Sequence, residues 1–176
     1  MFIGHFGLAF GARRLAPRTS LGTLFLAAQW LDLVWPTLLL LGIERVLIDP
    51  SLPGLTPLLF VHYPYTHSLV AALGWALLLG GAYFALTRYA RGAWVVGALV
   101  ASHWLLDAIV HRADLPLTVG GAARIGMGLW QSAPAAAIGV EVLLFIAGVA
   151  LFWRALGRGA SRGQRIGTAL LVAFLV

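Results

Sequence analysis

The chain has 176 residues, of which 61% are hydrophobic and 10% are charged, and it carries a formal net charge of +6. A soluble domain carries about 25% charged residues, so this chain is too poor in charge to cover itself with a wetted surface. The composition excludes an ordinary soluble domain and predicts an all-α, polytopic helical bundle, with residues 1–176 forming a single membrane-embedded domain. Cysteine is absent, which excludes disulfides and thiolate metal sites.

The apolar runs predict about four full spans, with short or partial helices at both ends of the chain. Residues 2–12 are too short to cross a bilayer, and the arginines follow this run, whereas a secretory signal has its charges first. The predicted spans are residues 20–42, 67–87, 92–111 and 133–153, and residues 166–176 form a partial helix. We expect Thr19 or Ser20 to cap the first full span and Pro36 to kink it.

Two connecting segments are predicted to be loops. Residues 43–66 contain prolines 50, 53, 57 and 64, which exclude a long helix, and residues 112–132 are rich in glycine. Histidine 67 lies where the first loop becomes a helix, and Thr66 or Ser68 can cap that helix. We therefore expect the His67 ring to lie at the mouth of a site, at a position that contributes little packing.

The arginines predict an orientation. All basic residues are Arg, and most lie in clusters within 13–18, 88–91 and 154–165, which fall on one side if the helices alternate. The side with more positive charge is the cytoplasmic one, so the N-terminus and both loops are expected outside a bacterial cytoplasmic (inner) membrane. Since topology accounts for the arginines, we expect membrane lipid as a partner and no nucleic acid.

The most informative stretch is ASHWLLDAIVH, residues 101–111, which places His103, Asp107 and His111 four residues apart. Residues at this spacing share one helix face, and ionisable groups inside a membrane nearly always face the bundle. We therefore expect these side chains to point inward, with Asp32 facing them. Imidazoles and carboxylates together suit a divalent ion, Zn²⁺ first, with Mn²⁺ or Fe²⁺ as alternatives.

The predicted topology brings further polar residues to the same outer half of the membrane. They include His5, His62 and His67, while His111 is an additional candidate ligand. Gln29 is a candidate for the second shell of the site, although a polar contact between helices also explains it. We expect Glu141 to be buried with a hydrogen bond or ion pair, and Asp114 to cap or turn the outer loop.

Four motifs resemble those of the membrane-bound metal-dependent hydrolase family, the YdjM-like group. They are Gly4–His5, an Asp before a Pro at Asp32–Pro36, HYPYTHSL at residues 62–69 and SHWLLD at residues 102–107, and they span roughly residues 4–116. The family patterns are GH, LPDIDHP, HRGxTHSL and SHxxxD in the same order. The resemblance implies that the metal ligands are His5, Asp32, His62, His67, His103 and Asp107.

One departure from these patterns affects the expected number of ions. The second Asp of the family's LPDIDHP falls on Val34, and the His that follows falls on Trp35. Two alternatives remain: a two-metal site is reduced to one ion here, or His111 compensates.

Three functions fit these residues. The first is a metal-dependent hydrolase with a His/Asp site at the extracytoplasmic face, acting on a lipid or lipid-linked ester or phosphoester. The second is a transporter that uses the same cluster to handle a cation or a proton. The third is a structural membrane partner whose polar residues only hold helices together. An enzyme needs an open coordination position and a pocket, a transporter needs a path to the cytoplasmic face, and a structural protein needs neither.

Overall fold

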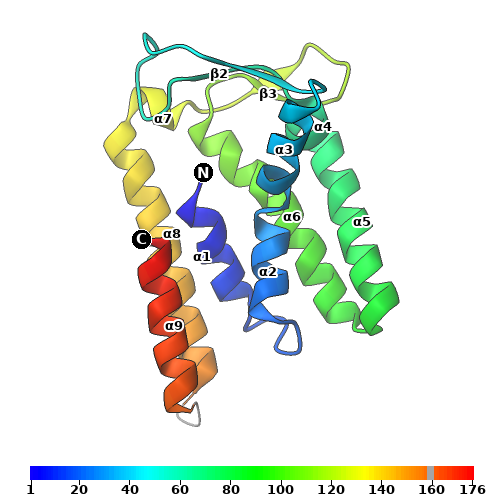
Figure 1. The fold of residues 1–176 in the computed structure, drawn as a ribbon, viewed down its shortest axis with the longest axis vertical. Coiled ribbons are helices and arrows are strands. Elements are labelled where there is room, and N and C mark those ends of the chain that lie inside the picture. Colours follow the sequence, from blue (N-terminus) through cyan, green and yellow to red (C-terminus); the bar gives the residue numbers. More distant parts are fainter. Residues whose placement is uncertain (158–160) are drawn as a thin grey trace.

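The computed structural model describes residues 1–157 and 161–176 and confirms an all-α membrane bundle (Figure 1). The described residues include three helices that are long and apolar enough to cross a membrane: α5 (Leu69–Thr87), α6 (Ala90–Val110) and α8 (Pro134–Leu156). Their outward side chains are large and apolar, and Leu77 and Trp94 are 76% and 79% exposed. Such faces are stable in lipid and would be costly in water, so these helices are compatible with an integral membrane protein.

The predicted span 20–42 is broken in two. Helix α2 (Leu21–Ala28) and helix α3 (Trp30–Leu40) meet at an angle of 53°, and Gln29 between them is not helical. This bend lies seven residues before Pro36, the position at which a kink was predicted, and α3 continues through that proline. The break coincides with the Ala28 carbonyl, which accepts a hydrogen bond of 2.8 Å from His103 Nδ1 on α6. The bend therefore lies at a contact with another helix and not at the proline.

The short first helix, α1 (Ile3–Ala12), packs against α8 at very close range. A Cβ added to Gly7 would lie 2.6 Å from the Leu144 carbonyl oxygen, and one added to Gly148 would lie 1.8 Å from the Gly7 oxygen. Only glycine allows two helix backbones to approach this closely. This contact holds α1, and with it His5, inside the bundle.

Helix α2 begins as predicted, and the C-terminal helix is partial. Ser20, not Thr19, caps α2 by accepting a hydrogen bond from the Thr23 amide. Helix α9 (Arg162–Leu175) has 14 residues and runs back along α8 (Figure 1). Its apolar face joins a cluster around buried aromatic residues of α1 and α8: Phe10, Phe145 and Phe152.

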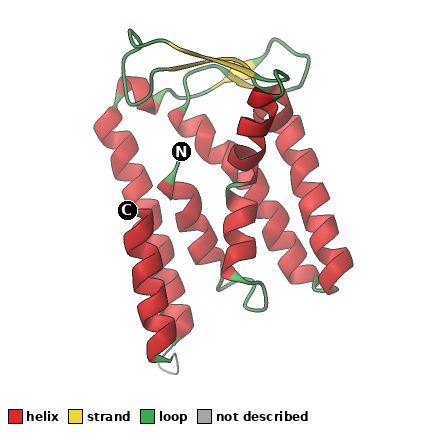
Figure 2. Ribbon diagram, viewed as in Figure 1, coloured by secondary structure: helices red, strands yellow, loops and turns green. Residues whose placement is uncertain are grey.

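The two predicted loops contain short strands and helices that cover one end of the bundle (Figure 2). In the first, β1 (Arg45–Ile48) pairs antiparallel with β2 (Leu58–His62), and α4 (Pro64–His67) follows. In the second, β3 (Leu115–Pro116) pairs with β4 (Arg124–Ile125) before α7 (Leu129–Ser132). The first segment was predicted to be a loop with at most short helical pieces, and α4 fits that prediction. The strands were missed in both segments. In the first, Pro50, Pro53 and Pro57 lie between β1 and β2, so they exclude a long helix without excluding strand pairing.

The arginine clusters separate as the topology requires. The turns between α1 and α2 and between α5 and α6 lie at the end of the bundle opposite the strands (Figure 1). Arg13, Arg14, Arg18, Arg88 and Arg91 therefore gather at that end, whereas the strand end holds Arg45, Arg112 and Arg124. Arg158 lies outside the described residues.

Candidate metal centre

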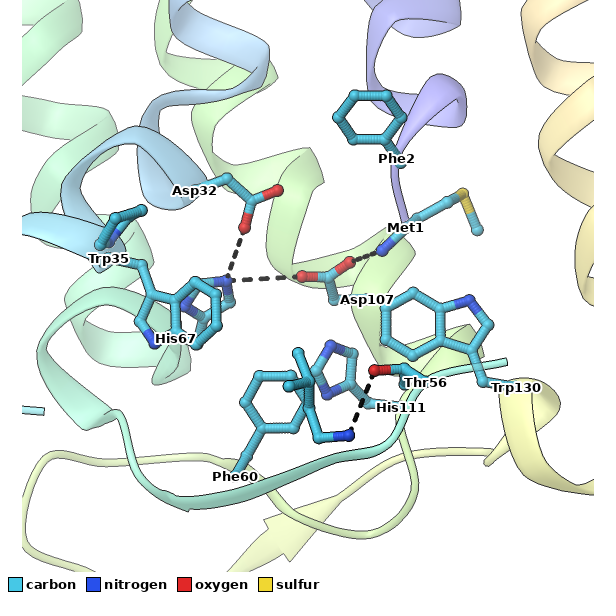
Figure 3. Close-up of a pocket in the computed structure, with 12 residues that line it drawn as sticks. Met1, Phe2, Asp32, Trp35, Thr56, Phe60, His67, Asp107, His111 and Trp130 are labelled. Carbon is cyan, nitrogen blue, oxygen red and sulfur yellow. Dashed lines mark hydrogen bonds and ion pairs between the residues drawn. The ribbon is translucent and has the colours of Figure 1, made fainter. Parts of the chain in front are cut away.

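Five predicted ligands from four helices meet below the strands, and several of them appear in Figure 3. His5 comes from α1, Asp32 from α3, His67 from the end of α4, and His103 and Asp107 from α6. Four of these residues are buried, whereas the Asp32 side chain keeps 37% of its exposure. They form two overlapping groups that could hold a metal ion, His5–His103–Asp107 and Asp32–His67–His103.

The α6 pair points into the bundle, as the helical spacing predicts. His103 Nε2 lies 3.2 Å from Asp107 Oδ2, four residues further along the same helix. Asp32 Oδ1 lies 3.5 Å from the same His103 nitrogen, which confirms that Asp32 faces the α6 pair. The bend between α2 and α3 contributes to this contact, because it begins three residues before Asp32.

The hydrogen bond of His103 determines its tautomer. Its Nδ1 faces the Ala28 carbonyl oxygen, which can only accept, so Nδ1 must carry the proton. In a neutral ring, Nε2 then carries no proton and offers a lone pair. This nitrogen is buried and has no hydrogen-bond partner. A lone pair that faces two carboxylates is unfavourable unless a cation or a proton lies between them.

His67 is oriented by a chain of hydrogen bonds that ends on a buried carboxylate. The Thr66 hydroxyl donates to Glu44 Oε2 at 2.7 Å, and it lies 2.7 Å from His67 Nδ1. Since the hydroxyl proton is used on Glu44, the Thr66 oxygen accepts from His67 Nδ1–H. The His67 Nε2 lone pair is therefore free, 3.4 Å from Asp32 Oδ1 and 3.7 Å from Asp107 Oδ2.

Glu44 also builds the turn that carries His67. Its Oε1 accepts hydrogen bonds from the amides of Tyr65 and Thr66 at the start of α4, at 2.8 and 2.9 Å. Ser68 caps α5, as predicted, by accepting from the Ala71 amide. His67 is only 4% exposed and its carbonyl accepts from Trp104 Nε1, so the expectation that it contributes little packing was wrong.

Each of the two imidazole nitrogens lies close to one oxygen of each carboxylate. His67 Nε2 and His103 Nε2 lie 3.2–3.7 Å from Asp32 Oδ1 and Asp107 Oδ2. A tetrahedral Zn²⁺ with bonds of about 2.0–2.2 Å has ligand atoms about 3.3–3.6 Å apart. Asp32, His67 and His103 therefore lie close enough together to hold one divalent ion, and Asp107 could join them if its carboxylate turned toward Asp32.

His5 lies on the other side of Asp107. Its ring stacks on the His103 ring with centroids 3.8 Å apart, and its Nε2 is 3.3 Å from Asp107 Oδ1. The backbone nitrogen of Met1 lies 2.5 Å from the same oxygen. The His103 Nε2 atom has one lone pair and can bind one ion, so the two groups cannot both use it. Asp107 has two oxygens and turns one toward each group.

The remaining predicted residues lie outside these two groups. His62 is on β2, and its ring contacts Tyr65 with centroids 5.9 Å apart, so the structure does not bring it to the cluster. Gln29 is buried at the bend and donates to the Phe2 carbonyl at 3.4 Å, which is a contact between helices. Glu141 is partly buried and accepts hydrogen bonds from the Phe2 amide, at 2.7 Å, and from the Gly4 amide in the first turn of α1.

His111 belongs to a neighbouring network. Its Nδ1 lies 3.3 Å from Asp114 Oδ1, and the Tyr63 hydroxyl donates to the same oxygen at 2.9 Å. Burial and the nearby Asp114 carboxylate raise the pKa of Tyr63, so the phenol stays protonated and remains a donor. Asp114 therefore orients two rings in addition to turning the outer loop.

A cavity of about 270 Å³ opens beside the cluster (Figure 3). Asp32, His67, Asp107 and His111 form its polar part. Its other walls come mostly from apolar side chains: Phe2, Trp35, Pro36, Leu58, Phe60 and Trp130. Three of the candidate ligands, Asp32, His67 and Asp107, thus border a space large enough for water and part of a ligand.

Sequence reasoning missed Glu44 and the bridging role of Thr66. Glu44 and Thr66 are 22 residues apart in the sequence. They meet because β1 and β2 pair as antiparallel strands, which brings the two ends of this segment together. An isolated acidic residue beside Arg45 resembles an ordinary loop charge, so no local signal marks it. In comparisons with known proteins, no family model, no curated protein and no solved structure matches this chain.

Proposed function

We propose that this protein is a membrane-embedded, metal-dependent hydrolase whose ion is held by Asp32, His67, His103 and Asp107. One observation carries the proposal: His67 Nε2 and His103 Nε2 each lie 3.2–3.7 Å from oxygens of Asp32 and Asp107, beside a cavity. The chemistry of the donors fits Zn²⁺ first, and Mn²⁺ or Fe²⁺ also accept imidazole and carboxylate ligands. The motif resemblance to membrane-bound metal-dependent hydrolases points in the same direction.

The arrangement supports hydrolysis in a specific way. A divalent ion at this position would lower the pKa of a water molecule and polarise an ester carbonyl or phosphoryl oxygen. Asp32, His67 and Asp107 line the cavity, so water and substrate can approach the site from that side. Thr66 and the Ala28 carbonyl hold the two imidazoles in the tautomer that offers Nε2 to the ion.

Packing below the cluster favours an enzyme over a transporter. Ala28 and Val100 lie in a hydrophobic core with Leu24, Val96 and Ala72, and each of them is at most 2% exposed. A transporter would need a polar path from the site to the opposite end of the bundle. Within the described residues, these apolar side chains surround the Ala28–His103 contact, whereas the cavity is lined by Leu58 and Phe60 of β2.

The proposed substrate is a lipid or lipid-linked ester or phosphoester in a bacterial cytoplasmic membrane, with the site facing outward. The arginine distribution supports the orientation, since the strand end of the bundle has fewer arginines than the opposite end. The mixed lining of the cavity supports an amphiphilic substrate, because acidic and imidazole groups lie opposite aromatic walls.

Metal analysis combined with an ester assay tests this function. Purified wild-type protein and His103→Ala are loaded with Zn²⁺, Mn²⁺ or Fe²⁺ and dialysed, and bound metal is measured by mass spectrometry. Hydrolysis of p-nitrophenyl butyrate and bis(p-nitrophenyl) phosphate is then followed. We expect about one ion per wild-type chain, loss of the ion in His103→Ala, and turnover that a chelator abolishes. Metal binding without turnover of any ester would refute the hydrolase, and equal metal in both proteins would refute the site.

A further inference from the structure

The cavity reaches the surface of the bundle at an apolar mouth. Phe2 and Pro36 are the two most exposed of its lining residues, and Phe2 is 61% exposed. Phe2 precedes α1 and Pro36 is in α3, so the mouth lies between these two helices and not among the strands. Asp32, one turn before Pro36, keeps 37% of its exposure. A ligand that passes Phe2 and Pro36 therefore meets a candidate metal ligand directly.

The bend between α2 and α3 accounts for this opening. Helix α2 packs against α1 and α6, but after the 53° turn α3 mainly contacts α2, α4 and α6. Next to the mouth, α3 carries Leu33 and Leu40, which are 52% and 90% exposed. Together α2 and α3 are long and apolar enough to form a fourth crossing, and a crossing at this position would place these side chains against lipid.

The site lies about 5–10 Å below the level of the lipid esters when α6 spans the hydrocarbon core. Helix α6 has 21 residues and is about 31 Å long, close to the ~30 Å of a hydrocarbon core. Asp107 lies three residues before the end of this helix, or about 5 Å below it, and His103 lies about 10 Å below it. A water-soluble substrate would have to pass the headgroup layer to reach them, whereas a lipid ester has only this short distance to move.

The size of the cavity indicates how much of such a molecule it encloses. A volume of about 270 Å³ equals roughly nine water molecules at ~30 Å³ each. This space holds an ester or phosphate group with its nearest methylenes and a water molecule, but not a complete lipid. The remaining chains must leave through the mouth, and the exposed Phe2 and Pro36 give them an apolar exit.

We propose that the substrate is a phospholipid that enters sideways from the membrane between Phe2 and Pro36. Its polar group lies against Asp32, His67 and Asp107, and its acyl chains stay in the bilayer beside α3. This inference rests on the proposed function for the identity of the site. The route itself requires lipid occupancy and no turnover, so the two can be tested separately.

Photolabelling in vesicles tests the route. Protein is reconstituted in phosphatidylglycerol and phosphatidylethanolamine with a phospholipid that carries a diazirine near the acyl carbonyl, irradiated and mapped by mass spectrometry. We expect label on two otherwise buried cavity residues, His67 and His111, as well as on lipid-facing Leu77. Pro36→Trp should reduce the cavity label at least fivefold and leave Leu77 unchanged. Leu40→Trp, on the same helix but outside the cavity, is the matched control.

Each outcome decides the proposal. Cavity label of equal strength in Pro36→Trp and wild type overturns the lateral route, as does a cavity without label beside a normally labelled Leu77. If Pro36→Trp does not fold, Phe2→Trp narrows the mouth from the other side without altering α3, and the same fivefold loss is expected. Cavity label in a protein that hydrolyses no ester would leave the route standing and refute the hydrolase.

Discussion

Replacing Thr66 by valine tests the hydrogen-bond chain that orients His67. Valine matches threonine in shape but has no hydroxyl, so His67 Nδ1 loses its acceptor and Glu44 Oε2 loses its donor. Without an acceptor at Nδ1, the ring can move its proton to Nε2, where Asp32 and Asp107 can accept it. The proton then competes with the metal for the same atom.

The expected loss follows from these contacts. Removing a partner that orients a metal-bound histidine typically lowers metal affinity 10- to 100-fold, or about 1.4–2.7 kcal/mol. Each buried polar atom left without a partner also costs about 1–3 kcal/mol of folding free energy. Glu44 and His67 are 1% and 4% exposed, so water cannot easily replace the hydroxyl. We therefore expect Thr66→Val to bind Zn²⁺ at least tenfold more weakly and to unfold at a lower temperature.

Competition with a chelating dye measures the dissociation constant on folded protein. Thr66→Ser keeps the hydroxyl and should bind within about threefold of wild type. Thr87→Val removes a hydroxyl that donates to the Tyr83 carbonyl at the far end of α5, and it should leave metal affinity unchanged. Wild-type affinity in folded Thr66→Val would refute the argument that Thr66 sets the tautomer of His67.

Three further changes test the fold and the ligand set. Gly148→Ala should lower the thermal unfolding temperature, because the added methyl group pushes α1 away from α8. Gly139→Ala in the same helix is the control and should leave that temperature unchanged, because a Cβ there has nothing within 4 Å. A cysteine introduced at Asp49 should react with an impermeant maleimide added outside the cell, and one introduced at Arg88 should react only from the cytoplasmic side. The reverse pattern would contradict the predicted orientation. His62→Ala should retain its metal by mass spectrometry, because His62 lies outside both candidate groups; loss of the ion would place it in the site.

Much of the fold and part of the site could be predicted from local patterns. Apolar runs long enough for a bilayer predict α5, α6 and α8, because in lipid a helix satisfies its own backbone hydrogen bonds. The four-residue spacing of His103 and Asp107 predicts a shared face by helix geometry alone. The need to remove ionisable groups from lipid predicts that this face turns inward, toward Asp32.

Long-range contacts decided the rest. The break at Gln29 coincides with a hydrogen bond between Ala28 and His103, which are 75 residues apart, so Pro36 misled a prediction based on neighbouring residues. The pairing of β1 with β2 brings Glu44 to Thr66, a relation that no spacing along the chain reveals. Helix periodicity is a local property and is visible in the sequence. Which side chains complete one another's hydrogen bonds depends on how distant helices and strands pack, and only the tertiary structure determines that.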